Sequence, residues 1–295
     1  MKINEITFKY GENAIQNARI ESDGNIIDYD VYGEINYTNM LSAAKGLDLI
    51  SEFYDVKAAC ALKGKNICAA ALGQTVTDAV QKVLDSNPID FISSVIVVSA
   101  EIDSDTAKFF KDSNTIVATG FTKNAIEYLE SHGIAYIKVN TPLKDYKNYI
   151  PEDIKKTTLG TFIQSPNMSE LDKDLFKIVT KQKPTVEQIE DAVFAWKVAK
   201  HTYSQSIVIA KDLKTTAVSQ GLQMAFIEPA LDFSCEMSKD AIIASDMPIS
   251  VHDVDAAAQG RIGLIIVPFA DNDVIKQADK YSISLITTNI TNVLC

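Results

Sequence analysis

Short apolar runs alternate with amphipathic segments along most of the chain, which is the pattern of an α/β protein. In the first half, runs that predict strands lie at residues 56–63, 94–99, 115–119 and 134–139. Segments with helical spacing lie at residues 39–53, 75–86 and 122–133 and after Ser104. The residues expected to cap three of these helices are Asn39, Thr75 and Thr122. Apolar strands separated by helices predict a parallel sheet covered on both faces.

The same alternation returns after a less regular middle segment. A long helix is expected to begin at Pro184 and Thr185, and two strands and a β/α/β/α/β pattern follow it. Two such series predict a three-layer α/β/α fold with two similar subdomains that share one interface. We place the subdomains at residues 1–183 and 184–295, with the irregular segment at the end of the first.

The stretch "LKGKNICAAALG" is expected to end a strand at a polar turn. Open α/β sheets gather ligand-binding groups at the carboxyl ends of parallel strands, so Lys63, Lys65 and Asn66 are candidate site residues. A solvated polar turn is an equally weighted alternative. Asp246 and the pair Thr288–Asn289 follow two later predicted strands, and we expect their positions to converge on one edge of the sheet.

Composition narrows the class of partner. Hydrophobic residues make up 46% of the chain and charged residues 23%, as in a fully folded globular protein. The net charge of −11 argues against a nucleic-acid or anionic-membrane surface and favours a small-molecule partner. No stretch approaches 18 apolar residues and the N-terminus lacks a signal-peptide pattern, so we expect a cytoplasmic protein without a membrane span.

Metal and nucleotide chemistry are not indicated. The histidines His132, His201 and His252 stand far apart, and the four cysteines lack CxxC spacing, so we expect no metal centre. The stretch "GKNICAAALG" matches neither glycine-rich phosphate loop.

Several segments in the same order resemble one enzyme family. "KYGENAIQNARI", "NYTNML", "LKGKNICAAALG", "VTKQKPTVEQIEDAVFAWKVAKHTYSQSIVIAK" and "AIIASDMPISVHDVDAAAQGRIGLIIVP" are similar to the transformylase half of the bifunctional purine-biosynthesis protein. The resemblance covers nearly the whole chain. It implies two cytidine-deaminase-like subdomains, a homodimer with sites across its interface, and formyl transfer from 10-formyltetrahydrofolate to the amine of 5-aminoimidazole-4-carboxamide ribonucleotide (AICAR).

The resemblance also assigns site residues. The family's catalytic turn reads Lys-His-x-Asn-Pro-Cys-Gly, and it implies catalytic roles for Lys63 and Asn66. The residues implied to bind the substrate are Lys9, Tyr10 and Asn39. Asp246 is implied to contact the pterin of the folate.

This chain departs from the family at reactive positions. Gly64 stands where the family has the histidine that accepts the amine's proton, and Lys9 replaces an arginine. Leu222, Ala225 and Thr291 stand at positions of a glutamine and two arginines. A missing general base typically costs about 10² to 10⁴ in rate, so we expect transformylase activity to be very low or absent. Two hypotheses follow: a formyltransferase with altered catalytic groups, or an inactive binding or regulatory protein that keeps the fold.

Overall fold

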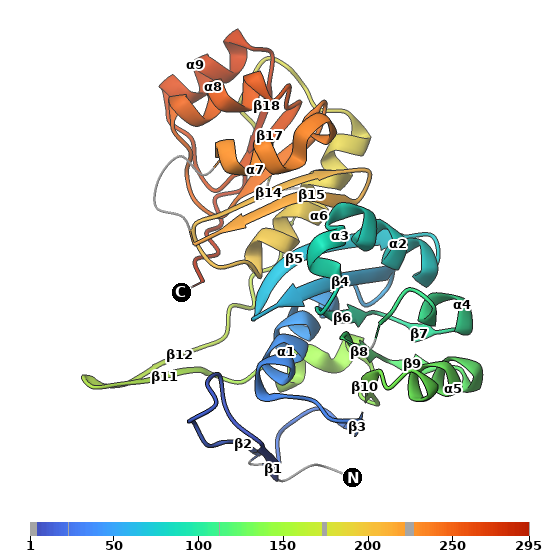
Figure 1. Cartoon of the computed structure of the whole chain (residues 1–295). Coiled ribbons are helices and arrows are strands. Elements are labelled where there is room, and N and C mark those ends of the chain that lie inside the picture. Colours follow the sequence, from blue (N-terminus) through green and yellow to red (C-terminus); the bar gives the residue numbers. More distant parts are fainter. Residues whose placement is uncertain (1–4, 23, 112, 173–175, 222–226, 295) are drawn as a thin grey trace.

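A continuous mixed sheet runs through both halves of the molecule (Figure 1). The computed structural model describes residues 5–22, 24–111, 113–172, 176–221 and 227–294. The twelve strands follow the order β13 (Lys177–Ile178), β18 (Ser284–Thr287), β17 (Leu264–Val267), β16 (Ile242–Ser245), β14 (Ser206–Lys211), β15 (Lys214–Gln220), β5 (Asn66–Gly73), β4 (Lys57–Lys63), β6 (Val95–Val98), β8 (Thr115–Ala118), β10 (Ala135–Val139) and β3 (Tyr29–Tyr32).

Helices cover both faces of this sheet. On one face, α1 (Tyr37–Ser51) and α6 (Val186–Lys200) share one apolar core, to which Leu47 and Phe194 contribute. The opposite face has a separate core in each half. The helices on that face are α2 (Val76–Ser86), α4 (Ser104–Ala107), α5 (Lys123–Ser131), α7 (Ile227–Ser234), α8 (Val251–Gln259) and α9 (Asn272–Lys280). The predicted three-layer α/β/α class is confirmed.

One order of elements occurs twice. The first half has α1, the hairpin β4–β5, α2 and then three parallel strands, β6, β8 and β10. The second half has α6, the hairpin β14–β15, α7 and the parallel strands β16, β17 and β18. The halves join edge to edge, where the Leu72 amide donates to the Leu213 carbonyl at 2.8 Å. The subdomain boundary between residues 183 and 184 stays a prediction.

The purely parallel sheet was a wrong prediction. In each half the hairpin runs antiparallel to the strand that follows it, as β4 does to β6 and β14 to β16. The alanine-rich run of β5 is a buried strand of this hairpin, whereas we expected a turn leading into a helix. The cap of α1 also differs from the prediction. The cap is Asn36, three residues before the predicted Asn39, and its side chain accepts the Asn39 amide. Thr75 and Thr122 cap α2 and α5 as predicted.

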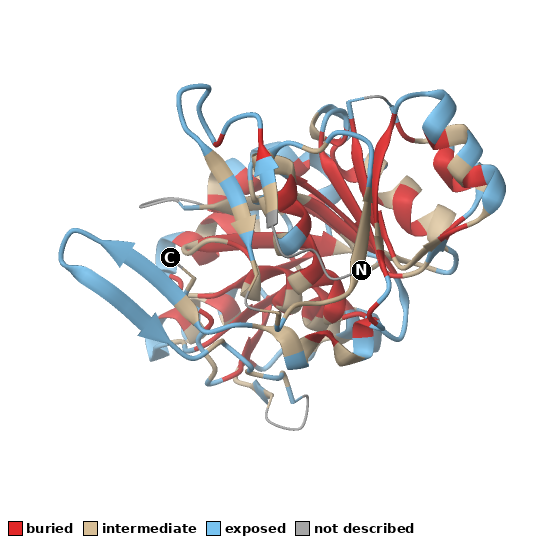
Figure 2. Cartoon of the chain, turned by 90° about the horizontal axis from the view of Figure 1, so that it is seen from below, coloured by how far each residue is buried: buried red, intermediate tan, exposed pale blue. Residues whose placement is uncertain are grey.

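Further short elements lie outside the main sheet. They are β1 (Glu5–Phe8) with β2 (Ala18–Glu21), β7 (Glu101–Ile102) with β9 (Gly120–Phe121), α3 (Pro88–Phe91), the 3₁₀ turns Leu143–Tyr149 and Cys235–Ser238, and β11 (Asp153–Thr157) with β12 (Gly160–Gln164). The β11–β12 hairpin projects from the body (Figure 1) and is exposed along nearly its whole length (Figure 2). Within the described ranges no helix combines the length and the apolarity that a bilayer crossing requires.

Candidate functional site

The predicted catalytic turn is the tip of the β4–β5 hairpin. Lys63 and Asn66 face each other in register, and Gly64 and Lys65 form the connection with φ values of +55° and +72°. Positive φ at both central residues is the mark of the tight hairpin turn whose twist matches the strands. The candidate residues therefore lie at a hairpin tip and not at the carboxyl end of a parallel strand, since β4 is antiparallel to both of its neighbours.

A pocket of about 380 Å³ opens beside this tip, between the two halves. We call it the inter-half pocket. Its walls come from the hairpin, from the α2–α3 connection, from β15 and from α7. The lining residues are Lys63, Asn66, Ile67, Cys68, Asn87, Asp90, Val218, Gln220 and Phe233. The structure thus places Lys63 and Asn66 in one cavity. Val218, Gln220 and Phe233, which line the same cavity, lie more than 150 positions later in the chain.

One wall of the inter-half pocket carries an ion pair. The Lys63 Nζ lies 3.4 Å from the Asp90 Oδ1, and the two side chains are 50% and 38% exposed. The other oxygen of Asp90 accepts from the Asn87 Nδ2 at 3.0 Å, while the Asp90 amide donates to the Asn87 Oδ1. Burial and the nearby Asp90 charge raise the pKa of the Cys68 thiol to about 11, so this cysteine is a thiol and not a thiolate at neutral pH.

The second half contributes an unused acceptor. The Gln220 Nε2 donates to the Ile67 carbonyl at 3.2 Å, which ties β15 to the hairpin. The Gln220 Oε1 is buried and has no hydrogen-bond partner among the described residues. A buried acceptor without a partner costs free energy, so Gln220 is a strained point in the wall of the pocket.

The hairpin tip also gathers two predicted substrate-binding segments. The Lys65 amide donates to the Ser42 Oγ at 3.0 Å. Ser42 lies on α1, about one helical turn after Asn39. The Lys65 Nζ lies 3.3 Å from the Glu12 Oε1. Glu12 follows the exposed residues Lys9 and Tyr10 closely in the sequence.

These contacts bring the N-terminal segment, α1 and the hairpin tip together, although Lys9 and Tyr10 do not line the inter-half pocket. Asn39 is half-buried and its Nδ2 donates to the Thr115 Oγ1 at 2.9 Å.

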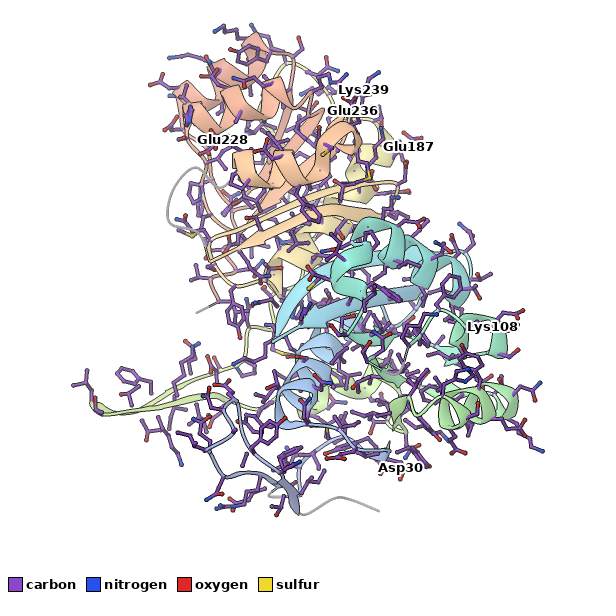
Figure 3. All side chains as sticks on the ribbon, in the orientation of Figure 1. Asp30, Lys108, Glu187, Glu228, Glu236 and Lys239 are labelled. Atoms are coloured by element: carbon purple, nitrogen blue, oxygen red, sulfur yellow. The ribbon has the colours of Figure 1, made fainter. Side chains whose placement is uncertain are left out.

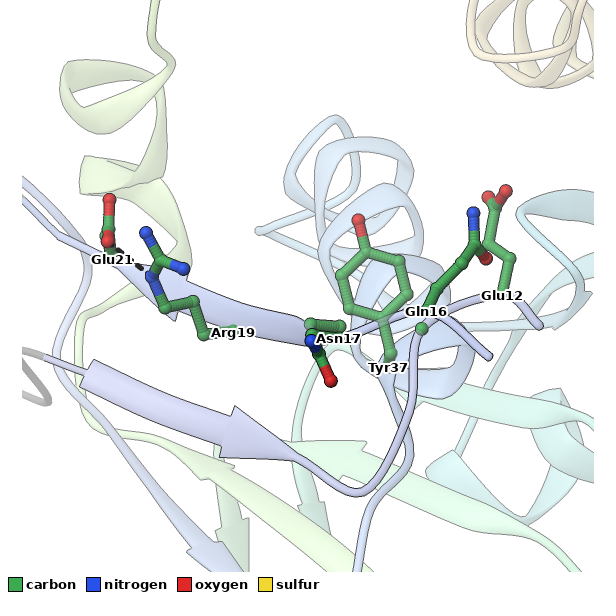
Figure 4. Close-up of a pocket in the computed structure, with 8 residues that line it drawn as sticks. Glu12, Gln16, Asn17, Arg19, Glu21 and Tyr37 are labelled. Carbon is green, nitrogen blue, oxygen red and sulfur yellow. Dashed lines mark hydrogen bonds and ion pairs between the residues drawn. The ribbon is translucent and has the colours of Figure 1, made fainter. Parts of the chain in front are cut away.

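A second, polar pocket of about 430 Å³ lies along the N-terminal segment (Figure 4). Its lining residues are Gly11, Glu12, Gln16, Asn17, Ala18, Arg19, Glu21 and Tyr37. Figure 4 shows Arg19 beside Glu21, and its Nε lies 2.5 Å from a Glu21 oxygen. Glu12 therefore belongs to this pocket and, through Lys65, also contacts the hairpin tip.

Asp246 is fully buried at the end of β16. Its carboxylate accepts from the Ser204 hydroxyl and, at 2.8 Å, from the Ser206 amide. Ser206 stands opposite Gln220 in the β14–β15 register, so Asp246 fixes the strand end beside the inter-half pocket. The parallel pairing of β16, β17 and β18 puts Thr288 and Asn289 at the same edge of the sheet, as predicted.

Outside the pockets, charged side chains mostly point to solvent, as Lys108 beside α4 does (Figure 3). One buried group of charges surrounds Glu52. The Glu52 carboxylate accepts from the Lys200 Nζ at 2.6 Å and lies 3.3 Å from the His201 Nε2. Burial alone would raise the pKa of Glu52, but the hydrogen bonds from His201 and Lys200 lower it to about 2. No described set of three or more His, Cys, Asp or Glu side chains is arranged to hold a metal ion.

The protein is an α/β protein whose two equivalent halves share one sheet. A pocket at the junction of the halves, lined by Lys63 and Asn66, is a candidate small-molecule site. The chain belongs to the AICARFT/IMPCHase bienzyme family, whose model matches residues 2–229. The family resemblance predicted from the sequence is therefore confirmed.

Curated relatives carry the description bifunctional purine biosynthesis protein PurH. The protein of Acetivibrio thermocellus is 32% identical over 303 residues, and that of Caldicellulosiruptor saccharolyticus is 31% identical over 300. The relative from Fusobacterium nucleatum is 32% identical over 301 residues. In each case the match covers 96% of this chain and 58% of the relative. The chain thus spans less than two thirds of the relatives' length.

Sequence reasoning missed the five residues that line the inter-half pocket from outside the hairpin: Asn87, Asp90, Val218, Gln220 and Phe233. Asn87 carried a usable signal, because an asparagine before a proline is a common helix cap, and Asp90 is its partner three positions later. Gln220 and Phe233 gave no signal, since only the joining of the two halves brings them to the hairpin. Leu222 and Ala225 lie outside the described residues.

Proposed function

We propose that this chain binds AICAR, or a closely related amino-bearing ribonucleotide, and transfers to its amine the formyl group of 10-formyltetrahydrofolate. The observation that carries the proposal is the position of Lys63 and Asn66 in the inter-half pocket, in a chain of this family. The unpartnered Gln220 Oε1 suits an amine or carboxamide N–H of the acceptor. Catalysis is slower than in relatives that keep the histidine, because Gly64 offers no base.

Each predicted residue has a role in this proposal. The Lys63 ammonium protonates the folate nitrogen as it departs, and Asn66 positions the formyl group. Tyr10 and Asn39 bind the substrate together with Lys9, whose ammonium binds the phosphate as a point charge, without the two-pronged geometry of an arginine. Asp246 is proposed to support the pterin side of the pocket through the strand end that it fixes.

We further propose a cytoplasmic homodimer. The β11–β12 hairpin supports the dimer. Phe162 and Ile163 are 57% and 60% exposed, and as successive strand residues they point to opposite faces of the hairpin. Both faces of the hairpin therefore carry uncovered apolar side chains, which a second copy would bury. The net charge of −11 fits a protein without nucleic-acid or membrane partners.

The second candidate function is a ligand-binding or regulatory protein without turnover, and Gly64 is the observation that favours it. A folate absorbance assay for tetrahydrofolate formation, with and without AICAR, separates the two. Turnover that depends on AICAR supports the transferase. Calorimetric binding of AICAR and a reduced folate without turnover supports the alternative, and neither binding nor turnover contradicts both.

A further inference from the structure

The inter-half pocket contains a carboxylate that has a fixed orientation. Asp90 sits on the short helix α3, and Asn87 holds one carboxylate oxygen while accepting the Asp90 amide. The remaining oxygen, Oδ1, faces the Lys63 Nζ at 3.4 Å. The Asp90 carboxylate is thus held by Asn87, the cap of its own helix, and it faces the predicted catalytic lysine. This position suits proton exchange with Lys63 and with a ligand in the pocket.

The other lining side chains are poor proton acceptors. Among the nine lining residues, Asp90 is the only carboxylate and none is a histidine. Cys68 keeps its proton at neutral pH, because burial and the Asp90 charge raise the pKa of its thiol to about 11. Asn66, Asn87 and Gln220 carry amides, which do not titrate. By elimination, proton acceptance in this pocket falls to Asp90.

We propose that Asp90 accepts the proton of the attacking amine and acts as a pair with Lys63, an inference that rests on the proposed formyl transfer. The amine nitrogen forms a bond to the formyl carbon and gives a proton to the Asp90 carboxylate. The bond from the formyl carbon to the folate nitrogen breaks, and the Lys63 ammonium protonates that nitrogen. The Asp90 carboxylic acid then returns its proton to the neutral Lys63 amine, which restores the starting ion pair with no other reactant.

This arrangement accounts for the loss of the histidine at Gly64. A carboxylate is ordinarily a weaker base than an imidazole at neutral pH, so the pair supports formyl transfer at a reduced rate. Gln220 lines the same pocket, and a rotation of its side chain that exposes the buried Oε1 is proposed to let it accept a second N–H of the substrate, which would orient the amine toward Asp90.

The test begins with four single variants, each compared with the wild type. Asp90→Asn keeps an oxygen for the Asn87 amide, and Lys63→Met keeps the apolar stem of lysine. The exposed Lys108–Asp105 pair, with its atoms 2.6 Å apart, supplies the matched controls Asp105→Asn and Lys108→Met. We expect Asp90→Asn to lower kcat by about 100-fold or more with little change in the Kd for AICAR, and Lys63→Met to do the same. The controls should leave kcat unchanged.

Two readouts separate a proton-transfer role from a structural one. Because the two residues act as a unit, the double variant should lose no more rate than the more damaging single change. In Asp90→Ala, added acetate should restore part of the rate by supplying a carboxylate to the pocket. Wild-type turnover that survives Asp90→Asn overturns the assignment of Asp90 alone. Absence of wild-type turnover with every amine tested overturns the formyl-transfer proposal and, with it, the role of Asp90.

Discussion

Replacing Gly64 by histidine restores the family's base and tests whether the hairpin tip is the catalytic centre. The turn resists this change, because Gly64 has a φ of +55°, where a side chain costs about 1–2 kcal/mol. Space does not resist it, since a Cβ built there has no atom of the described residues within 4 Å apart from its own chain neighbours. Strain of this size should lower Tm by a few degrees in a chain of this length.

The gain expected at the active site exceeds that cost. A positioned base contributes about 10² to 10⁴ in rate, or roughly 3–5 kcal/mol of the activation barrier. We therefore expect Gly64→His to raise kcat by at least tenfold while Tm falls. In the Gly64→His background, Asp90→Asn should lower kcat much less than it does in the wild type, because the imidazole accepts the amine's proton instead of Asp90.

The matched control is Gly133→His. Gly133 follows α5 with a φ of +65° and equally open space, so it carries the same strain away from the pocket. The assay is the folate absorbance change at saturating AICAR, with Tm and the Kd for AICAR measured on the same samples. An unchanged kcat in Gly64→His, with Tm lowered as in the control and AICAR still bound, would refute the assignment of this hairpin as the catalytic centre.

Two further predictions concern stability and assembly. Lowering the pKa of Glu52 from 4.5 to about 2 corresponds to about 3 kcal/mol of stability, present above pH 5 and lost as the pH falls toward 2. Glu52→Gln should therefore lower the free energy of unfolding at pH 7 by about that amount and much less near pH 2, whereas the exposed Glu127→Gln should have little effect at either pH. Phe162→Asp should convert the proposed dimer to monomer by light scattering, and the similarly exposed Val186→Asp on α6 should not. A Phe162→Asp protein that stays dimeric contradicts the role given to the β11–β12 hairpin.

The sequence was informative where local chemistry decides the structure. Thr75 and Thr122 predicted two helix starts because their side chains accept amides within their own helices. The parallel strands of each half were visible as continuous apolar runs, as in β6 and β17. Strand direction was not visible, because β4, which is antiparallel to both of its neighbours, has a buried run like that of the parallel strands β6 and β8. A buried antiparallel strand and a buried parallel strand thus have the same sequence pattern.

The site was predictable only in part for a related reason. Lys63 and Asn66 could be found because the turn "KGKN" is polar between apolar strands and matches a family motif. Asp90 reads as a helix-cap partner, and its contact with Lys63 spans 27 positions that no local pattern links. Gln220 lies 153 positions from the Ile67 carbonyl that it bonds. The tertiary fold of the first half brings Asp90 to Lys63, and only the meeting of the edge strands of the two halves brings Gln220 to the hairpin.

The junction of the halves bears on the proposed function of a pocket whose turn has Gly64 in place of the family's histidine. Open space around the turn residue Gly64 leaves room for other side chains, at a backbone cost of about 1–2 kcal/mol for its positive φ. The walls of the pocket are more constrained: Gln220 bonds the Ile67 carbonyl, Asn87 caps α3 and orients Asp90, and Asp246 fixes the end of β14. Removing the contact of Asp246 with the Ser206 amide leaves a buried polar group unpaired, at a cost of about 1–3 kcal/mol. Folding therefore constrains these wall contacts more tightly than the open space at the turn, and the proposed chemistry relies on Asp90, which Asn87 of the wall orients.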